Sequence, residues 1–248
     1  FIPIGPSRWQ PAPGCTPIIA RESCTASLIV MPSVGTCGRA KPCNTPIVTF
    51  GQYINTLPAW EQRLLHGIQL QHQPYEIRHK LHQTGAPARS LLVSDGSKRS
   101  EIITYGWVFG SEHEDIYAKH AGDGFGEFTS HRAEAWGMLS GLVFIHHLFV
   151  YTHSSADQTL PAMPVTLLTD NSGLVSRVQQ RLAYDTPYPN ATLVPDWDIV
   201  EQIVKTMQQT HGCKFEVSWV KGHQDETAEL LTVEAKYNVI ADALAGGF

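Results

Sequence analysis

The chain has 248 residues, of which 42% are hydrophobic and 17% are charged, as is usual for a soluble globular protein. This length is enough for one large domain, or for one domain with an appendage. The start of the chain lacks the features of a secretory signal, and two histidines interrupt the most apolar run, residues 141–151. We therefore expect no contact with a membrane and a location inside the cell, in the cytoplasm or the nucleus.

Charge is distributed unevenly along the chain, whose net charge is −5. Residues 1–89 contain eight Lys or Arg and three Asp or Glu, whereas residues 90–248 contain ten and twenty. The second part therefore does not have the composition of a free-standing nucleic-acid binder. We predict two parts, a basic and largely irregular extension over residues 1–89 and a folded domain over residues 90–248.

The first 48 residues are rich in proline, glycine and cysteine, which predicts irregular structure apart from a short strand at residues 27–31. The cysteines of the chain are odd in number and form no Cys-x-x-Cys pair, which favours reduced thiols. They are Cys15, Cys24, Cys37, Cys43 and Cys213. The spacing of Cys37 and Cys43 only weakly indicates a zinc site.

One helix is predicted in the rest of the extension, from Pro58 to about Gln71, with Pro58 in its first turn. Positions 57, 60, 64 and 68 are all apolar and form one face of this helix. The polar stretch over residues 79–90 contains glycine and proline and has the composition of a linker.

From residue 91 the sequence alternates between strand and helix patterns. Three strands are predicted at residues 91–97, 102–109 and 116–121, joined by short polar turns. A long helix over residues 130–151, with Ser130 as its N-cap, precedes a strand at 165–169. Helices at 171–183 and 196–210, a strand at 215–220 and a last helix within 227–244 follow. The order βββαβααβα predicts a mixed α/β layer fold.

Four carboxylates lie within these elements or at their ends. Asp95 follows the buried apolar run 91–93, and a carboxylate in a sheet interior is costly unless a positive charge neutralises it. Glu134 lies in the first turn of the long helix, Asp170 ends the fourth strand, and Asp242 lies on the last helix. Taken singly, each has a simpler explanation, as a turn residue, a helix-start acid or a solvated acid.

Strand ends and helix starts in an α/β sheet can meet at one edge, where four carboxylates would repel one another unless cations lay among them. Oxygen-only ligands select hard ions such as Mg²⁺ or Mn²⁺. Two such ions, roughly 4 Å apart, activate water and stabilise the leaving oxygen in phosphodiester hydrolysis. The pattern is therefore compatible with a two-metal hydrolase.

Five short motifs occur in order over residues 91–244. They are Ser94-Asp95-Gly96-Ser97, Arg132-Ala133-Glu134-Ala135, Thr169-Asp170-Asn171, Trp219-Val220-Lys221-Gly222-His223 and Asn238-Val239-Ile240-Ala241-Asp242. Together they resemble a type 1 ribonuclease H domain, of the kind found in retroelement reverse transcriptases. The resemblance implies a ribonuclease H-like five-stranded mixed sheet flanked by helices. It also implies a site with two Mg²⁺ ions, or Mn²⁺ as a substitute, that cuts the RNA strand of RNA–DNA hybrids. An attached or associated polymerase domain is implied too, and residues 1–89 would be its tail or connection region.

The resemblance also assigns roles to single residues. It makes Asp95, Glu134, Asp170 and Asp242 the metal ligands, and it places His223 on a mobile loop where it assists proton transfer or product release. Asn238 would order that loop and the nearby helix. The residues expected to contact substrate are Gly96, Ser97, Thr129, Ser130, Asn171 and Asn238.

The chain departs from the family pattern at two places. Residues 225–236 form a longer and more acidic segment than the usual loop, and Val239 stands where a glutamate is usual. Residues 184–197 contain no Lys or Arg, whereas cellular members have a basic helix and loop. Trp197 is a candidate for stacking on a sugar or base, although core packing is the commoner role. The adjacent His146 and His147 point in different directions and make a poor metal pair.

Two other functions stay open at this point. The first is a non-catalytic nucleic-acid-binding module that keeps the fold as a scaffold, and the presence of all four acids argues against it. The second is a related nuclease or transposase that acts on DNA. The pairing of the motif at residues 221–223 with the one at residues 238–242 argues against that function.

Overall fold

The computed structural model describes residues 2–5, 8–10, 49–83, 89–153, 162–184, 194–226 and 230–248. The chain forms two compact units, Phe1–Val48 and Thr49–Phe248. In the first unit, strand β1 (Ile2–Gly5) pairs antiparallel with strand β2 (Arg8–Gln10). The strand expected at residues 27–31 and the four cysteines of this unit lie outside the described residues.

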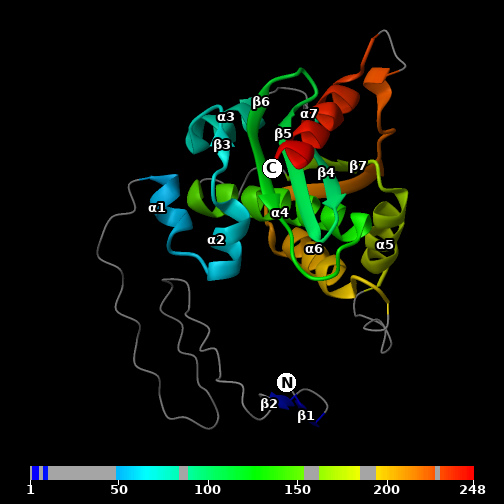
Figure 1. The fold of residues 1–248 in the computed structure, drawn as a ribbon. Coiled ribbons are helices and arrows are strands. Elements are labelled where there is room, and N and C mark those ends of the chain that lie inside the picture. The colour runs from blue at the N-terminus through cyan, green and yellow to red at the C-terminus, as the bar shows by residue number, and fades with distance from the viewer. Residues whose placement is uncertain are drawn as a thin grey trace. The chain divides into compact units, whose positions relative to one another are not determined.

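The second unit is built on one six-stranded sheet with the strand order β3-β6-β5-β4-β7-β8 (Figure 1). The strands are β3 (Gln69–Leu70), β4 (Ser90–Arg99), β5 (Ile102–Ser111), β6 (Ile116–Asp123), β7 (Met163–Thr169) and β8 (Cys213–Trp219). The pairs on the β3 side of β4 are antiparallel, and β4, β7 and β8 run parallel. The expected mixed α/β layer fold is confirmed, with β3 added as a sixth strand to the five expected.

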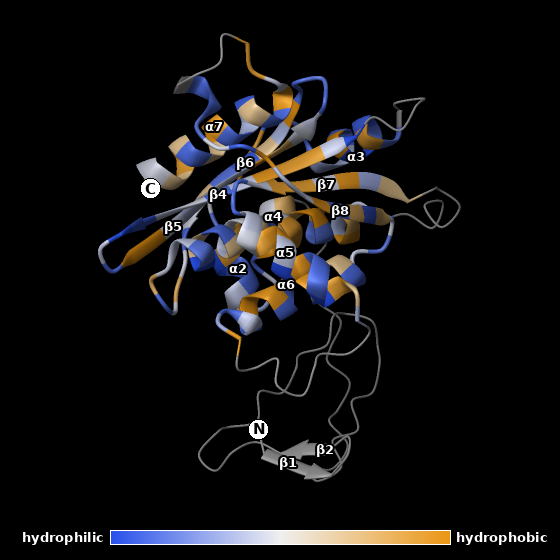
Figure 2. Ribbon diagram, turned by 90° about the vertical axis from the view of Figure 1, so that its right-hand side faces the viewer, coloured by the Kyte–Doolittle hydropathy of each residue, from blue (hydrophilic) through white to orange (hydrophobic). Residues whose placement is uncertain are grey.

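Helices cover both faces of this sheet (Figure 2). Helices α4 (Ser130–Tyr151), α5 (Ser172–Leu182) and α6 (Trp197–Gln209) lie on one face, and α7 (Val233–Gly247) lies on the other. Because successive strand residues point to opposite faces, Leu91 and Val93 of β4 pack with Tyr237 of α7, whereas Leu92 belongs to the core on the α4 side. β4 is therefore buried on both sides, which explains its continuous apolar run.

Helix α4 is the core helix of the unit. Among the described residues it is the one helix long and apolar enough to cross a membrane, and 89% of its apolar window is buried inside the protein. It approaches the sheet closely at Gly141, where an added Cβ would lie 2.5 Å from Cδ1 of Leu92. Thr129 caps the helix by accepting a hydrogen bond from the backbone N–H of Arg132 at 3.1 Å, one residue before the expected cap.

Residues 49–83 belong to the compact unit of the sheet, whereas the sequence predicted a division at residue 90. They form α1 (Phe50–Ile54), α2 (Ala59–Leu65), β3 and α3 (Pro74–Gln83). Strand β3 pairs with β6, and Leu64, Leu65 and Ile77 are buried in the main core. The predicted helix stops short of residue 71 because Gly67 adopts a left-handed φ of 84°, and part of the predicted linker is helical in α3.

A buried polar chain also joins this segment to α4. His147 is held between Tyr53, whose hydroxyl lies 2.8 Å from Nδ1, and Glu61, whose Oε2 lies 3.1 Å from Nε2. Because an ionised carboxylate can only accept, Nε2 donates to Glu61. His146 bonds separately to Thr210 at 3.2 Å. Both histidines therefore have structural partners.

Candidate active site

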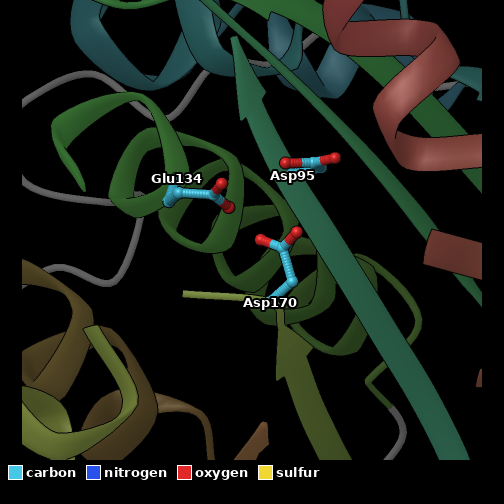
Figure 3. Close-up of side chains that lie close together, drawn as sticks. All are labelled: Asp95, Glu134 and Asp170. Atoms are coloured by element: carbon cyan, nitrogen blue, oxygen red, sulfur yellow. The ribbon is translucent and has the colours of Figure 1, made fainter. Parts of the chain in front are cut away.

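Three carboxylates gather where β7 ends: Asp95 of β4, Glu134 of α4 and Asp170 (Figure 3). One oxygen of each lies within 4.8 Å of the others. The strand register explains two of the three positions. The parallel pairing of β4 with β7 ends at Val93 opposite Leu168, so Asp95 and Asp170 stand two residues further on, on the same face.

Glu134 reaches this point because α4 presses against β4. A Cβ added to Gly96 would lie 2.3 Å from the backbone nitrogen of Glu134 and 2.5 Å from the carbonyl carbon of Ala133. At position 96 there is no room for a side chain between this strand and the helix. The structure thus gives Gly96, an expected substrate contact, the role of setting the distance between two carboxylates.

Two hydrogen bonds orient these carboxylates. The hydroxyl of Thr169 donates to Oε2 of Glu134 at 2.9 Å, and the backbone N–H of Gly96 donates to Oδ1 of Asp95 at 2.7 Å. In the described part of the chain, none of the ion pairs involves Asp95, Glu134 or Asp170. The negative charge of the cluster is therefore not neutralised by a lysine or arginine there.

The environment opposes ionisation of all three acids. Burial raises the pKa of Asp95 to about 6, and the negative charges of Asp170 and Asp242 add to this shift. Burial and the charge of Asp95 raise the pKa of Glu134 well above its ordinary value. The pKa of Asp170 is also raised, mainly by burial, although the positive charge of His223 opposes this. Perturbed carboxylates held close together in this way mark a functional site.

The three acids fit a hard divalent cation. Their donor atoms are all carboxylate oxygens, which Mg²⁺, Mn²⁺ and Ca²⁺ prefer. Bound positive charge would remove the mutual repulsion that raises their pKa values. Asp95 and Glu134 are 6% and 5% exposed, so the protein holds their oxygens in place before any ion arrives.

Asp242, the fourth expected ligand, stands beside this cluster and is exposed. Its charge raises the pKa of both Asp95 and Asp170, so it lies within electrostatic reach of them. Its helix is fixed on the sheet at Gly106, where an added Cβ would lie 2.3 Å from the carbonyl oxygen of Ala241. The structure thus brings three of the four acids into one group and places Asp242 next to it.

His223 is exposed and adopts a left-handed backbone conformation, with a φ of 49°. Its effect on the pKa of Asp170 places it near the cluster. The preceding Gly222 lies against Asp170, because a Cβ built on it would be 2.3 Å from Oδ2. The loop that carries the histidine therefore passes directly beside one of the three carboxylates.

The other expected contacts occupy different settings. Asn171 caps α5 by accepting a hydrogen bond from the backbone N–H of Leu174 at 3.0 Å, and Ser130 is exposed at the start of α4. Ser97 is half-buried on β4, and Asn238 is buried, with its Oδ1 unpaired among the described atoms. Trp197 is 39% exposed at the start of α6.

Sequence reasoning missed Thr169, whose hydroxyl donates to Glu134, and Gly222, which lies against Asp170. Both lie within the quoted motifs, but neither was assigned a function there. The alternation of strand residues gave a signal for Thr169, because the residue before Asp170 must face α4, the helix that carries Glu134. The close approach of Gly222 to a residue of another strand leaves no such local signal.

No protein-family model matches the chain, and no curated protein matches it in sequence. Among solved structures, it is similar to the N-terminal RNase H domain of Rv2228c from Mycobacterium tuberculosis, with 19% identity and a TM-score of 0.42. That match covers 64% of this chain and 92% of the other. LC11-RNase H1, solved in complex with an RNA/DNA hybrid, matches with 16% identity, coverages of 64% and 94% and a TM-score of 0.43. The foamy viral protease-reverse transcriptase, solved in complex with double-stranded DNA, matches with 13% identity, coverages of 64% and 92% and a TM-score of 0.41.

Proposed function

We propose that this chain is a ribonuclease H that hydrolyses the RNA strand of RNA–DNA hybrids inside the cell, as part of a retroelement reverse transcriptase. The observation that carries the proposal is the convergence of Asp95, Glu134 and Asp170. They come from three motifs that are far apart in the sequence, and among the described residues no lysine or arginine forms an ion pair with them where they meet at the end of β7. Clustered negative charges at a sheet edge add little to packing, and bound cations would stabilise them.

The residues that would hold two Mg²⁺ ions, or Mn²⁺ in their place, are Asp95, Glu134, Asp170 and Asp242. Such ions, when bound, lower the pKa of water and stabilise the negative charge that develops in phosphodiester hydrolysis. Thr169 holds the Glu134 carboxylate in a fixed direction through its hydroxyl. The products would be a 3′-hydroxyl and a 5′-phosphate.

His223 would move a proton in this reaction. It is exposed on a loop whose preceding residue touches Asp170, so its imidazole can approach a phosphate beside the carboxylates. It lies outside the three-acid group, and its loss should therefore slow turnover more than it weakens metal binding. General acid–base assistance of this kind contributes roughly 10²–10⁴-fold.

The hybrid would be recognised by its backbone shape and its 2′-hydroxyls, so base sequence should matter little. Residues 90–248 have twice as many acidic as basic residues, which disfavours independent binding of a polyanion. An attached polymerase domain that delivers the hybrid would resolve this conflict.

Cleavage assays on labelled substrates test the proposal. RNA–DNA hybrid, single-stranded RNA, duplex RNA and duplex DNA are each incubated with the full chain and Mg²⁺, and we expect cleavage of the RNA in the hybrid alone. Asp170→Asn should abolish this cleavage, whereas Asp123→Asn, which alters a half-exposed aspartate paired with Arg63, should retain it. Cleavage of duplex DNA would instead support a DNA-acting relative. Metal-dependent binding without cleavage of any substrate would support a non-catalytic module.

A further inference from the structure

The segment from Trp219 to His223 surrounds Asp170. Trp219 is the last residue of β8 and lies opposite Thr169 in the parallel register. Its indole Nε1–H donates to the carbonyl oxygen of Asp170 at 2.8 Å. The next residue, Val220, donates its backbone N–H to the carbonyl oxygen of Thr169 at 3.1 Å.

This segment touches Asp170 on two sides. Trp219 holds the backbone carbonyl, and Gly222 lies against the carboxylate, where an added Cβ would come within 2.3 Å of Oδ2. Asp170 itself stands after the last paired residue of β7 and before α5, so the regular pairing of the sheet no longer fixes its backbone. The direction of its carboxylate therefore depends on contacts from the neighbouring strand.

Packing alone does not account for a tryptophan at this position. Its side chain is 53% exposed, whereas Trp107 in the core is fully buried. A phenylalanine would keep an aromatic ring at this position, but it would lack the N–H that reaches Asp170. The hydrogen bond to Asp170 is the specific contact that a tryptophan supplies here, so the indole nitrogen is the part of Trp219 that matters.

We propose that Trp219 is a positioning residue of the metal centre, which fixes the Asp170 carbonyl through its indole N–H and thereby holds the Asp170 carboxylate in place for a divalent cation. This inference rests on the proposed function, because it requires that Asp170 binds a metal. It goes beyond that function by assigning a role to a residue outside the set of carboxylate ligands.

The experiment is a Mn²⁺ titration of the full chain, with free ions counted by electron paramagnetic resonance at a pH above the Asp95 pKa of about 6. Trp219→Phe should bind Mn²⁺ about 2- to 10-fold more weakly than the wild type, as expected for one lost hydrogen bond. Its thermal midpoint should stay close to the wild-type value because the ring is retained and half-exposed. Trp60→Phe makes the same chemical change on α2, at a tryptophan that is 39% exposed, and should leave Mn²⁺ affinity unchanged.

A double substitution tests whether Trp219 acts through Asp170. In the Asp170→Asn background, Trp219→Phe should weaken Mn²⁺ binding no further, because the ligand it positions is gone. Wild-type affinity in Trp219→Phe, an equal loss in Trp60→Phe, or a full additional loss in the Asp170→Asn background would each overturn the inference. A wild-type chain that binds no Mn²⁺ would overturn the proposed metal function and the inference together, whereas equal binding by wild type and Trp219→Phe would overturn the inference alone.

Discussion

Helix α4 carries two buried ionisable side chains two residues apart, and each lies between two aspartates. Arg132 donates to Asp198 at 3.0 and 2.7 Å and to Asp196 at 3.1 Å. Glu134 lies with Asp95 and Asp170, with one oxygen of each within 4.8 Å of the others. The two central side chains are both buried, at 8% and 5% exposure, and both have aspartates as neighbours, but their charges have opposite signs.

This difference separates a structural cluster from a binding site. The hydrogen bonds from Arg132 lower the pKa of Asp198, so that cluster is satisfied within the protein and fastens α4 to the start of α6. Around Glu134 the pKa values are raised instead, because burial and like charges oppose ionisation. Of these two clusters, only the second would gain stability from a cation supplied from outside.

The largest expected effect is that of Glu134→Gln. Removing this charge should lower hybrid cleavage and Mn²⁺ affinity by more than about 10²-fold, since even residues behind metal ligands contribute 10–100-fold. The thermal midpoint of the metal-free protein should be unchanged or higher, because a repulsive charge has been removed. A variant that retains full affinity for Mn²⁺ would exclude Glu134 from the site.

Arg132→Gln, in contrast, should destabilise the folded protein. The side chain of Asp196 is only 5% exposed and would lose its closest guanidinium, which should lower the free energy of unfolding by about 2–3 kcal/mol. The thermal midpoint would then fall by about 5–10 °C. Arg63→Gln, in a half-exposed pair with Asp123, should cost no more than about 1 kcal/mol. An equally small loss for Arg132→Gln would contradict its structural role.

Gly96→Ala tests how the Glu134 site is spaced. The added methyl group would meet the backbone of Ala133 and Glu134, which cannot move aside as a side chain can. We expect a loss of about 2–3 kcal/mol in the free energy of unfolding, together with weaker Mn²⁺ binding. Gly51→Ala is the control, since nothing lies within 4 Å of its added Cβ. Unchanged Mn²⁺ affinity in Gly96→Ala would show that this spacing does not matter.

The grouping of acids around Glu134 was expected from the sequence, whereas the Arg132 cluster was not. Asp95 follows an apolar run and Asp170 ends a strand, and these local patterns permitted the two to meet at one sheet edge. The family resemblance then named both of them, with Glu134, as ligands. The partners of Arg132 lie 64 and 66 residues away in the sequence. Asp196 has a left-handed φ of 57°, and no neighbouring glycine in the sequence indicates this conformation. Long-range pairing of this kind leaves no periodic signal.

The boundary of the domain was also beyond local patterns. The apolar positions at residues 57, 60, 64 and 68 predicted a longer helix, but Gly67 ends α2 and allows β3 to reach β6. The sixth strand depends on two residues, Gln69 and Leu70, which is too short a run to show the alternation of a strand. These two residues form a strand only because they pair with β6.

The smallest expected effect is a difference in pH dependence between the two sites. The folded pKa of Asp95 is raised to about 6, so its contribution to stability is full below its unfolded pKa of about 4 and is lost as the pH rises toward 6. The folded pKa of Asp198 is lowered, so its contribution is present above the unfolded pKa and is lost as the pH falls. The measurement is the thermal midpoint of three metal-free proteins, the wild type, Asp95→Asn and Asp198→Asn, from about pH 3 to about pH 7. At each pH, the midpoint of each variant is subtracted from that of the wild type.

The wild type should lose stability relative to Asp95→Asn as the pH rises, and relative to Asp198→Asn as the pH falls. Added Mg²⁺ should abolish the first trend, because a cation binds the ionised carboxylates and so competes with protons. It should leave the second trend unchanged, because Asp198 already has Arg132 as its partner. If Mg²⁺ altered neither trend, protons and metal would not compete at Asp95, and the three carboxylates would not be the metal site.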